Sequence, residues 1–274
     1  TGSSVASKST PVDAEVKKVA AELKSAGSKG VVVTGLNDKN AQIIAMAINQ
    51  ALQSEVMDVA TTNNIRQGND AEVTKLVADL KSGAVKGLIT FNVNPLYSLA
   101  AANDVKEAIG KLKLSVALSD QFDETASSVD YALPASHYLE SWGDVSLTSG
   151  TYSLVQPTIQ PLFNSRQLQD VLLKWSGNST SYYDYLKAFW ASNILGGQSW
   201  NQALHDGVFV KTESNSVTAN SVDVAAAAST LVGVTKPSVM ELNLYTSTAL
   251  GDGKQANNPW LQELPDPLTR ATWD

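Results

Sequence analysis

The sequence predicts an α/β fold: a doubly wound, mostly parallel Rossmann-like sheet flanked by helices, followed by an irregular helical C-terminal extension. Two observations lead to this prediction. Between residues 28 and 135, short apolar runs of strand length alternate with longer segments whose apolar residues recur at helical spacing. The connections between them are short, and this alternation is typical of parallel strands joined by crossover helices.

The first elements of this pattern lie before residue 61. Residues 12–26 place Ala, Val and Leu between Lys and Glu at helical spacing, and the glycines that follow predict the end of that helix. Val31–Val33 is a β-branched run and predicts a short buried strand. Residues 40–52 carry an apolar helical stripe, and residues 56–60 predict a second strand.

The alternation continues to residue 133. Residues 70–80 and 95–109 have helical periodicity, and a glycine follows each of them. Residues 87–91, 114–118 and 131–133 are the expected strands.

The rhythm changes after Pro134. Residues 145–159 surround Gly150 with Thr, Tyr and Val and predict either an extended pair or a clamp across the sheet. Helical patterns follow, and an alternating segment near the end predicts one half-buried strand. The helices are expected at residues 167–175, 181–195 and 200–205, and the strand at residues 240–245.

Three regions follow from these patterns. Residues 1–12 are rich in Ser and Thr and are expected to be a linker. Residues 13–165 are expected to form the α/β domain. Residues 166–274 are expected to be a helical and irregular extension that leads towards a further domain of a longer protein.

Composition excludes several classes of function. The 274 residues carry a formal net charge of −7, which argues against nucleic acid as a partner because a phosphate backbone needs clustered Lys and Arg. The chain has no Cys, so it holds no disulfide and no Cys-ligated zinc or iron–sulfur cluster. No run of 18 apolar residues occurs, and no direct membrane span is expected.

Polar residues follow three of the expected strands, at residues 34–37, 92–95 and 119–120. Ligands of open α/β sheets lie beyond the carboxyl ends of strands, so these residues are candidates for binding a nucleotide or a pterin. Asn, Asp and Pro are also the usual residues for leaving a strand and capping a helix. Neither a G-x-G-x-x-G turn nor a Walker lysine motif is present.

Carboxylates and two histidines are the remaining candidates for chemistry. The carboxylates could act as acid and base or hold a hard metal, or they could simply start helices and turns. Neither His137 nor His205 lies in an H-E-x-x-H motif, which leaves a proton relay or a structural hydrogen bond as their roles. The carboxylates are Asp120, Asp123, Glu124 and Asp130.

Taken in order, these residues resemble the molybdopterin oxidoreductases. The shared series is Asn94-Pro95, Asp120, Glu124-Thr125-Ala126, Asp130, Leu133-Pro134, Glu140 and Gly143. A closer resemblance is to the molybdopterin-like, iron–sulfur subunits of bacterial alternative complex III. The elements similar to those subunits include Val32–Gly35, Asn94–Tyr97, Ser136–Glu140 and Ser153–Ile159.

This resemblance implies a non-catalytic scaffold domain of a subunit in a quinol-oxidising respiratory electron-transfer complex. It implies no catalytic residue, no metal ligand and no cofactor in these residues, with iron–sulfur clusters elsewhere in the parent protein. In cofactor-bearing relatives, Asn94, Asp120 and Thr125 would lie near the pterin nucleotide, so they are vestigial candidates for cofactor binding.

The same resemblance implies where the domain works and what it contacts. Its partners would be other subunits of a membrane-bound respiratory complex and the cluster-bearing domain of the same protein. Because the family is Tat-exported, the periplasmic face of the bacterial inner membrane is expected. Two alternatives remain: a catalytic-subunit domain that binds a pterin guanine dinucleotide, and a stand-alone nucleotide-binding module.

Overall fold

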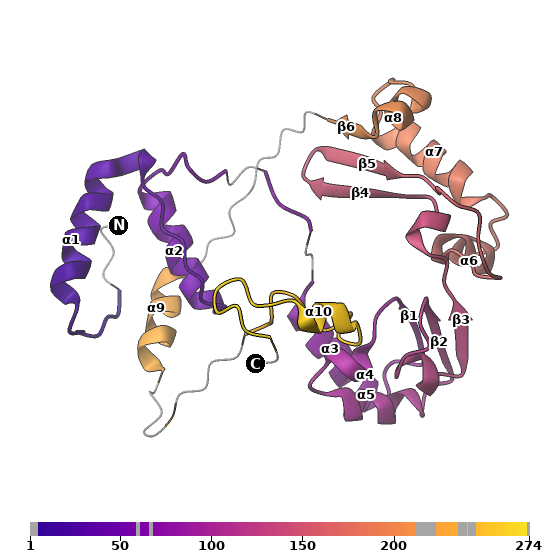
Figure 1. Cartoon of the computed structure of the whole chain (residues 1–274), viewed down its shortest axis with the longest axis horizontal. Helices are drawn as coiled ribbons and strands as arrows, with labels where there is room; N and C mark the ends of the chain where they lie inside the picture. The colour runs from indigo at the N-terminus through magenta and orange to yellow at the C-terminus, as the bar shows by residue number, and fades with distance from the viewer. Residues whose placement is uncertain are drawn as a thin grey trace. The chain divides into compact units, whose positions relative to one another are not determined.

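The structure is a computed structural model that describes residues 5–58, 61–65, 68–211, 223–234, 240 and 245–272. The chain divides into two compact units (Figure 1). The first comprises Thr1–Thr62 and Ser214–Leu244, and the second comprises Asn63–Glu213 and Tyr245–Asp274.

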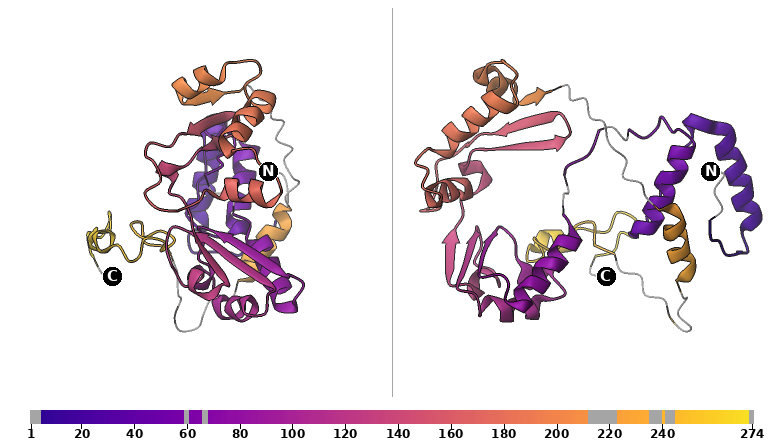
Figure 2. Two further views of the ribbon diagram at one scale, coloured as in Figure 1. Left: turned by 90° about the vertical axis from the view of Figure 1, so that its right-hand side faces the viewer. Right: turned by 180° about the vertical axis from the view of Figure 1, so that it is seen from behind.

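A parallel sheet of three strands forms one half of the second unit, in the order β1-β2-β3 (Figure 2). Its register pairs Gly87 with Leu114 and Val116 with Tyr131. The predicted α/β class, with parallel strands flanked by helices, is therefore confirmed. The strands are β1 (Gly87–Phe91), β2 (Leu114–Ser119) and β3 (Tyr131–Pro134).

Helix α3 (Asp70–Ser82) begins at the predicted residue and ends at Ser82, two residues beyond the predicted end. The Asn69 side chain accepts hydrogen bonds from two main-chain N–H groups of its first turn, and Gly83 ends it in the left-handed region at φ 74°. The single helix expected at residues 95–109 is instead two, α4 (Pro95–Ser98) and α5 (Ala102–Ile109). The break falls at Leu99, whose backbone is extended at ψ 138°.

An antiparallel sheet forms the other half of the second unit, in the order β4-β5-β6, and confirms the extended pair expected after residue 145. Two residues, Ser149 and Gly150, join β4 to β5, and Gly150 has φ 78°. The strands are β4 (Gly143–Thr148), β5 (Thr151–Val155) and β6 (Val208–Val210). The helices of this half are α7 (Tyr182–Asn193) and α8 (Trp200–Asp206), whereas α6 (Leu168–Trp175) packs Leu168 and Val171 against the parallel sheet.

Helices α7 and α8, together with Ile194 and Leu195 between them, supply the core of this half. Trp190 is 1% exposed, and its indole Nε1 donates to Asp144 Oδ2 on β4 over 2.9 Å. Trp200 lies perpendicular to Trp190, with ring centroids 6.0 Å apart. The remaining core residues are Leu186, Ile194, Leu195 and Ala203.

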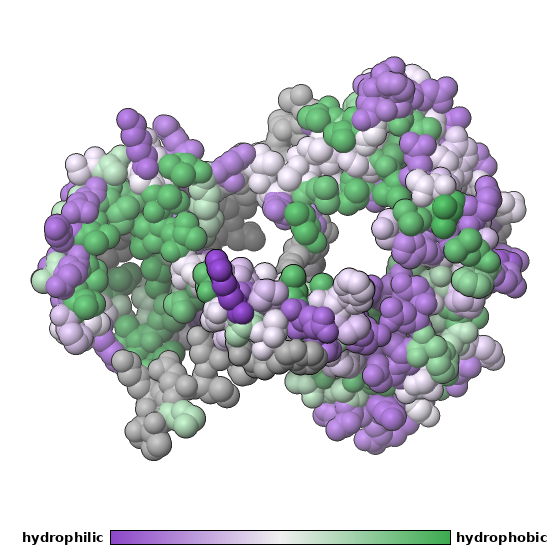
Figure 3. All heavy atoms as spheres, viewed as in Figure 1, coloured by the Kyte–Doolittle hydropathy of each residue, from purple (hydrophilic) through white to green (hydrophobic). Residues whose placement is uncertain are grey.

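The described part of the first unit is helical, with α2 packed on α9. The surface of this unit shows apolar spheres gathered over its helices (Figure 3). In α1 no residue is buried, and Val16 and Val19 are both exposed. The helices are α1 (Asp13–Ala26), the 3₁₀ turn η1 (Gly27–Lys29), α2 (Lys39–Ala51) and α9 (Val224–Gly233).

The strand predicted at Val31–Val33 is wrong: these residues join no sheet, and Val33 is 84% exposed. A β-branched run favours extended backbone, but a strand also requires a neighbouring strand. Here the side chain of Asn49 on α2 bonds both main-chain groups of Val32 and takes the place of that neighbour.

Two other expected strands fall wholly or partly outside the described residues. Residues 56–58 form no strand, while residues 59–60 are not described. Of residues 240–245, the four from 241 to 244 lie outside the description. In the described ranges, no helix combines the length and apolar character that a bilayer crossing demands. The short helices that complete the described chain are η2 (Ala126–Ser128), η3 (Tyr138–Glu140) and α10 (Pro259–Glu263).

Candidate functional site

The polar residues that follow β1 and β2 meet at one edge of the parallel sheet. Because the strands are parallel and in register, their carboxyl ends lie together. Asn92 leaves β1 with φ 47°, a left-handed conformation that Asn tolerates, and its N–H donates to the Leu118 carbonyl over 2.9 Å. Asn92 Oδ1 accepts from the Asp120 N–H at 3.2 Å. The Asn92 side chain therefore ties the two strand ends together.

Asn94 is held from both sides by the segment that follows β2. Its Oδ1 accepts from the Thr125 hydroxyl over 2.7 Å, and its Nδ2 donates to Glu124 Oε2 over 2.6 Å. Thr125 is fully buried, and its hydroxyl also accepts from the Leu96 N–H at 3.2 Å. Both polar atoms of the Asn94 amide are thus engaged within the protein.

A cavity of about 320 Å³ opens beside this network. Both Asn94 and Asp120 line it, whereas Thr125 lies buried behind the wall. Residues 252–257 form a further wall, where a Cβ added to Gly253 would lie 3.2 Å from the Tyr97 ring. The remaining lining residues are Asn92, Val93, Ser98, Ser119, Gln121, Asp123, Glu124, Asp252, Lys254, Ala256 and Asn257.

Carboxylates dominate the charge of this cavity, which has one ammonium group, that of Lys254, in its lining. The amide of Asn94 holds the pKa of Glu124 below its ordinary value, since it donates a hydrogen bond to the ionised form. Asp123 Oδ1 accepts from the Ala126 N–H at 2.8 Å. The carboxylates are Asp120, Asp123, Glu124 and Asp252.

A second cavity of about 280 Å³ shares Ser119, Asp120 and Gln121 with the first. The other lining residues of the second cavity are mostly apolar. Asp120 therefore lies between the first cavity, lined mainly by polar residues, and the second, lined mainly by apolar ones. That other lining is Ala117, Phe122, Ala126, Ala132, Leu133 and Pro134.

Asp130 does not join the other carboxylates. Its Oδ2 accepts from both the main-chain N–H and the hydroxyl of Ser115, near the start of β2. It therefore fastens the end of the sheet away from the cavity. Within the described ranges, no group of three or more His, Cys, Asp or Glu side chains is placed to hold a metal ion.

His137 has a structural position. Its Nδ1 accepts from the Leu139 N–H at 3.3 Å, while its own N–H donates to Glu140 Oε2, so the two residues form a capping box on η3. Glu140 Oε1 in turn accepts from the Leu162 N–H at 3.0 Å. Of the two roles expected for His137, these contacts favour the structural hydrogen bond over the proton relay.

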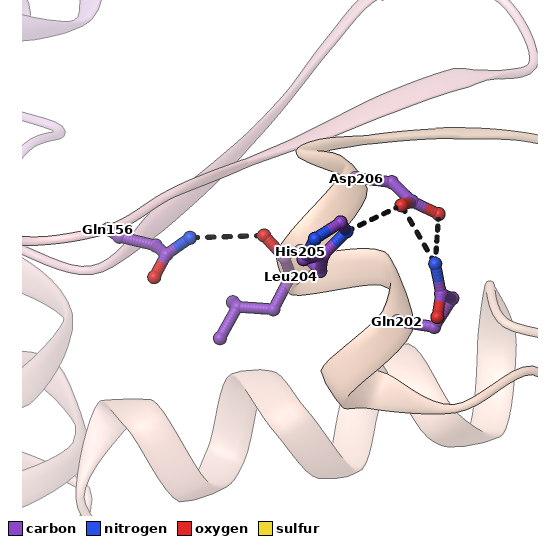
Figure 4. A network of polar contacts seen from close by, with 5 residues as sticks. All are labelled: Gln156, Gln202, Leu204, His205 and Asp206. Atoms are coloured by element: carbon purple, nitrogen blue, oxygen red, sulfur yellow. Dashed lines mark hydrogen bonds and ion pairs between the residues drawn. The ribbon is translucent and has the colours of Figure 1, made fainter.

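His205 lies on the surface at the end of α8 (Figure 4). Its Nδ1 is 3.0 Å from Asp206 Oδ1, and Gln202 Nε2 donates to both oxygens of the same carboxylate. Gln202, and then His205, hold the pKa of Asp206 below its ordinary value. Because Gln202, His205 and Asp206 are all exposed, these contacts serve the helix end.

Sequence patterns did not identify the wall at residues 252–257 or its contact with Tyr97. That wall belongs to a loop-like segment more than 150 residues from Tyr97, and no local periodicity links the two. Gly253 has φ +80°, and in the sequence only the presence of a glycine indicates such a conformation.

Comparisons with known proteins bear on the whole region. A model of the molybdopterin oxidoreductase family matches residues 6–176. The menaquinone reductase molybdopterin-binding-like subunit of Nitratidesulfovibrio vulgaris is 32% identical over 122 residues, which are 41% of this chain and 18% of that protein. The assimilatory nitrate reductase catalytic subunit of Bacillus subtilis is 36% identical over 80 residues, 29% of this chain and 11% of that protein.

Among solved structures, acetylene hydratase from Pelobacter acetylenicus aligns with a TM-score of 0.42 and 17% identity over 50% of this chain and 20% of that one. The matched part of the chain spans less than a fifth of the length of each of the two relatives, the menaquinone reductase subunit and the nitrate reductase subunit. The family match extends over more than half of the chain, from before α1 to the end of α6. The protein belongs to the molybdopterin oxidoreductase family.

Proposed function

We propose that the chain is a non-catalytic, molybdopterin-like scaffold domain of a subunit in a respiratory quinol-oxidising electron-transfer complex. Membership of the molybdopterin oxidoreductase family supports the molybdopterin-like character of the domain. Its place in a quinol-oxidising complex is supported by the similarity to the molybdopterin-binding-like subunit of a menaquinone reductase. The role is structural: the domain packs against other parts of the complex and carries out no step of the reaction itself.

The observation that carries this proposal is the charge of the strand-end cavity. The family implies a molybdenum-bearing pterin nucleotide, whose diphosphate is an anion that needs cationic side chains or free N–H donors. Four carboxylates and one lysine line the cavity, and the amide of Asn94 already bonds Thr125 and Glu124. These residues do not fit a dinucleotide diphosphate.

The wider setting is proposed on the resemblance described above. The partners are other subunits of a membrane-bound complex of the alternative complex III type, together with an iron–sulfur cluster-bearing domain of the same protein. The domain lies at the periplasmic face of the inner membrane. Asn94, Asp120 and Thr125 are then the vestige of a cofactor site, in which Asn94 and Thr125 still bond one another across the two strand ends.

Ligand binding by the purified chain tests the proposal. The molybdenum content is measured by mass spectrometry, and the melting temperature is recorded with and without 1 mM guanosine diphosphate. We expect no molybdenum and no melting shift. A site with a dissociation constant a hundredfold below the nucleotide concentration would stabilise the protein by about 2.7 kcal/mol, so a reproducible upward shift would refute the scaffold role.

A variant with fewer negative charges tests whether the carboxylates are the reason that the cavity does not bind the nucleotide. Replacing Asp120 and Asp252 by Asn removes two negative charges from the lining while keeping the size of each side chain. If repulsion excludes the nucleotide, this variant gains a melting shift that the wild type lacks. The matched control is Asp130→Asn, which removes a carboxylate outside the cavity.

The second candidate function is a catalytic-subunit domain that holds a pterin guanine dinucleotide. The 36% identity to part of a nitrate reductase catalytic subunit favours it. It requires the wild-type chain to respond to the guanine nucleotide, and the same melting experiment therefore separates the two functions.

A further inference from the structure

The turn that joins α6 to α7 (Figure 1) carries the only Asn-x-Ser/Thr triplet of the sequence, Asn178-Ser179-Thr180. This triplet is the acceptor sequence for N-linked glycans, and its third residue supplies a hydroxyl that the transferring enzyme requires. A triplet is usable only where the folded chain exposes it. The geometry of the turn therefore decides whether Asn178 accepts a glycan.

The end of α6 fixes the main chain at Asn178. Gly177 has φ +81°, and its N–H donates to the Lys174 carbonyl over 3.1 Å. The Asn178 N–H donates to the Leu173 carbonyl over 2.9 Å. These two bonds around a left-handed glycine form a Schellman motif, a common C-terminal cap of a helix. The helix before the turn thus determines the position of Asn178.

The side-chain nitrogen of Asn178 is free to react. Its Oδ1 accepts from the Thr180 N–H over 2.9 Å, whereas its Nδ2 and the Thr180 hydroxyl make no hydrogen bond among the described residues. Residues 176–181 are all exposed, and none of them lines the two cavities described above. The nitrogen that would react and the hydroxyl that an enzyme requires are therefore both accessible.

An exposed aromatic ring precedes the triplet. Trp175 is the last residue of α6, lies three positions before Asn178 and is 52% exposed. Gly177 turns the chain between these two residues. The face of an indole ring is a large apolar surface, and packing the C–H groups of a sugar ring against it removes that surface from water. The turn thus combines an acceptor nitrogen with a platform for the sugar that would be attached to it.

We propose that Asn178 is an N-glycosylation site and that the first sugar packs on the Trp175 ring. Asn178 Nδ2 attacks C1 of a glycan linked to a lipid diphosphate. The N–C1 bond forms as the C1–O bond breaks, and the diphosphate leaves with the electron pair of that bond. Nδ2 gives up one proton to a carboxylate of the transferring enzyme. In cells this inference rests on the proposed periplasmic location, because N-linked glycans are found on exported proteins.

Glycan transfer to the folded, purified chain tests the acceptor site. The chain is incubated with a lipid-diphosphate oligosaccharide and a single-subunit oligosaccharyltransferase that requires Asn-x-Ser/Thr alone. Mass spectrometry of the intact chain and of its peptides measures the product. We expect one glycan per chain, at Asn178, and a chain that stays unmodified would overturn the proposal. The assay needs no export, so this failure is distinct from a failure of the proposed location or of the scaffold role.

Variants at two positions separate the triplet from the fold of the turn. Asn178→Asp keeps the Oδ1 acceptor for the Thr180 N–H but has no amide nitrogen, so we expect no transfer at an unchanged melting temperature. Thr180→Ala removes the hydroxyl and should slow transfer by at least about tenfold, the effect of one lost hydrogen bond. Thr180→Ser, which keeps a hydroxyl, is the matched control. A wild-type rate in Thr180→Ala would refute the assignment.

The melting temperature tests the role of Trp175. Attachment of the glycan should raise the melting temperature of the wild type and of Trp175→Phe, because both keep an aromatic face beside the sugar. The same glycan should leave the melting temperature of Trp175→Ala unchanged. Equal shifts in the wild type and Trp175→Ala would show that the ring does not hold the sugar.

The chain purified from its own cells shows whether the site is used. Trypsin cuts after Lys174 and Lys187, so residues 175–187 form one peptide. We expect this peptide to carry the glycan in the periplasmic fraction, and enzymatic removal of the glycan should convert Asn178 to Asp. An unmodified peptide in that fraction would overturn the modification and leave the proposed location intact, whereas a chain found in the cytoplasm would overturn both.

Discussion

The Thr125 hydroxyl donates to Asn94 Oδ1 over 2.7 Å and joins the turn after β1 to the segment after β2. The two residues lie 31 positions apart in the sequence, and the Thr125 side chain is completely buried. This bond fixes the rim of the strand-end cavity from within. The Thr125 hydroxyl oxygen also accepts a hydrogen bond from the Leu96 N–H at the start of α4.

Replacing Thr125 by Val should destabilise the protein markedly. The substitution preserves shape but leaves Asn94 Oδ1 and the Leu96 N–H without their partner, which costs about 1–3 kcal/mol in a buried site. Urea denaturation measures the loss. Thr125→Ser, which keeps the hydroxyl, is the matched control, and equal stability of the two variants would show that the hydrogen bonds contribute little.

Trp190→Phe should weaken the antiparallel half of the second unit. The variant loses the bond from Nε1 to Asp144 and leaves space in the core, and truncation of a large buried side chain costs about 2–4 kcal/mol. Chemical denaturation followed by far-ultraviolet circular dichroism is the measurement. Asp144→Asn keeps an acceptor for the indole and is expected to lose less. A larger loss in Asp144→Asn than in Trp190→Phe would contradict this account.

Acid should destabilise the wild type more than Glu140→Gln. The main-chain N–H of Leu162, followed by that of His137 and the Ser165 hydroxyl, holds the pKa of Glu140 below its ordinary value. A carboxyl whose pKa is lowered on folding contributes stability above its unfolded pKa, about 4.3, and loses it as the pH falls through the folded value.

The measurement is the urea midpoint of both proteins between pH 7 and pH 3. The difference between wild type and Glu140→Gln should be largest at neutral pH and should shrink below the unfolded pKa of Glu140. Glu263→Gln serves as the control, because Glu263 accepts no hydrogen bond among the described residues. A constant difference across the whole range would exclude Glu140 as the source.

Gly253→Ala should displace the wall at residues 252–257. The residue has φ +80°, and its new Cβ would meet the Tyr97 ring at 3.2 Å. The left-handed conformation alone costs about 1 kcal/mol for a residue with a Cβ. Faster hydrogen exchange of residues 252–257 is the expected result. Adding Tyr97→Ala should relieve the contact but not the conformational strain, and full recovery in the double variant would contradict the role given to φ.

The local patterns predicted elements where one physical cause dominates. β1 and β2 are short apolar runs, and α3 has both an Asn cap and a left-handed glycine, so residues close in sequence determine them. Val31–Val33 misled because strand formation also requires a neighbouring strand, and Asn49 on α2 takes that place. A β-branched run does not reveal which group its main chain will bond.

The candidate site was partly visible in the sequence for the same reason. Asn94 and Asp120 follow parallel strands, and parallel strands bring their carboxyl ends together, which places both residues on one cavity. Asp130 was grouped with them by proximity in sequence, but β2 lies between its position and the cavity. The contact of Gly253 with Tyr97 depends on packing between distant segments, which spacing along the chain does not encode.

The aromatic core around Trp190 has a spectroscopic consequence. Every tryptophan of the chain lies after residue 141, and the parallel sheet from β1 to β3 contains none. Trp190 and Trp200, which are shielded from solvent, report on the antiparallel half of the second unit, whereas Trp260 is 84% exposed and follows the segment that lines the strand-end cavity. Fluorescence and amide circular dichroism recorded on one denaturation series would thus distinguish concerted melting of the two halves from melting in succession.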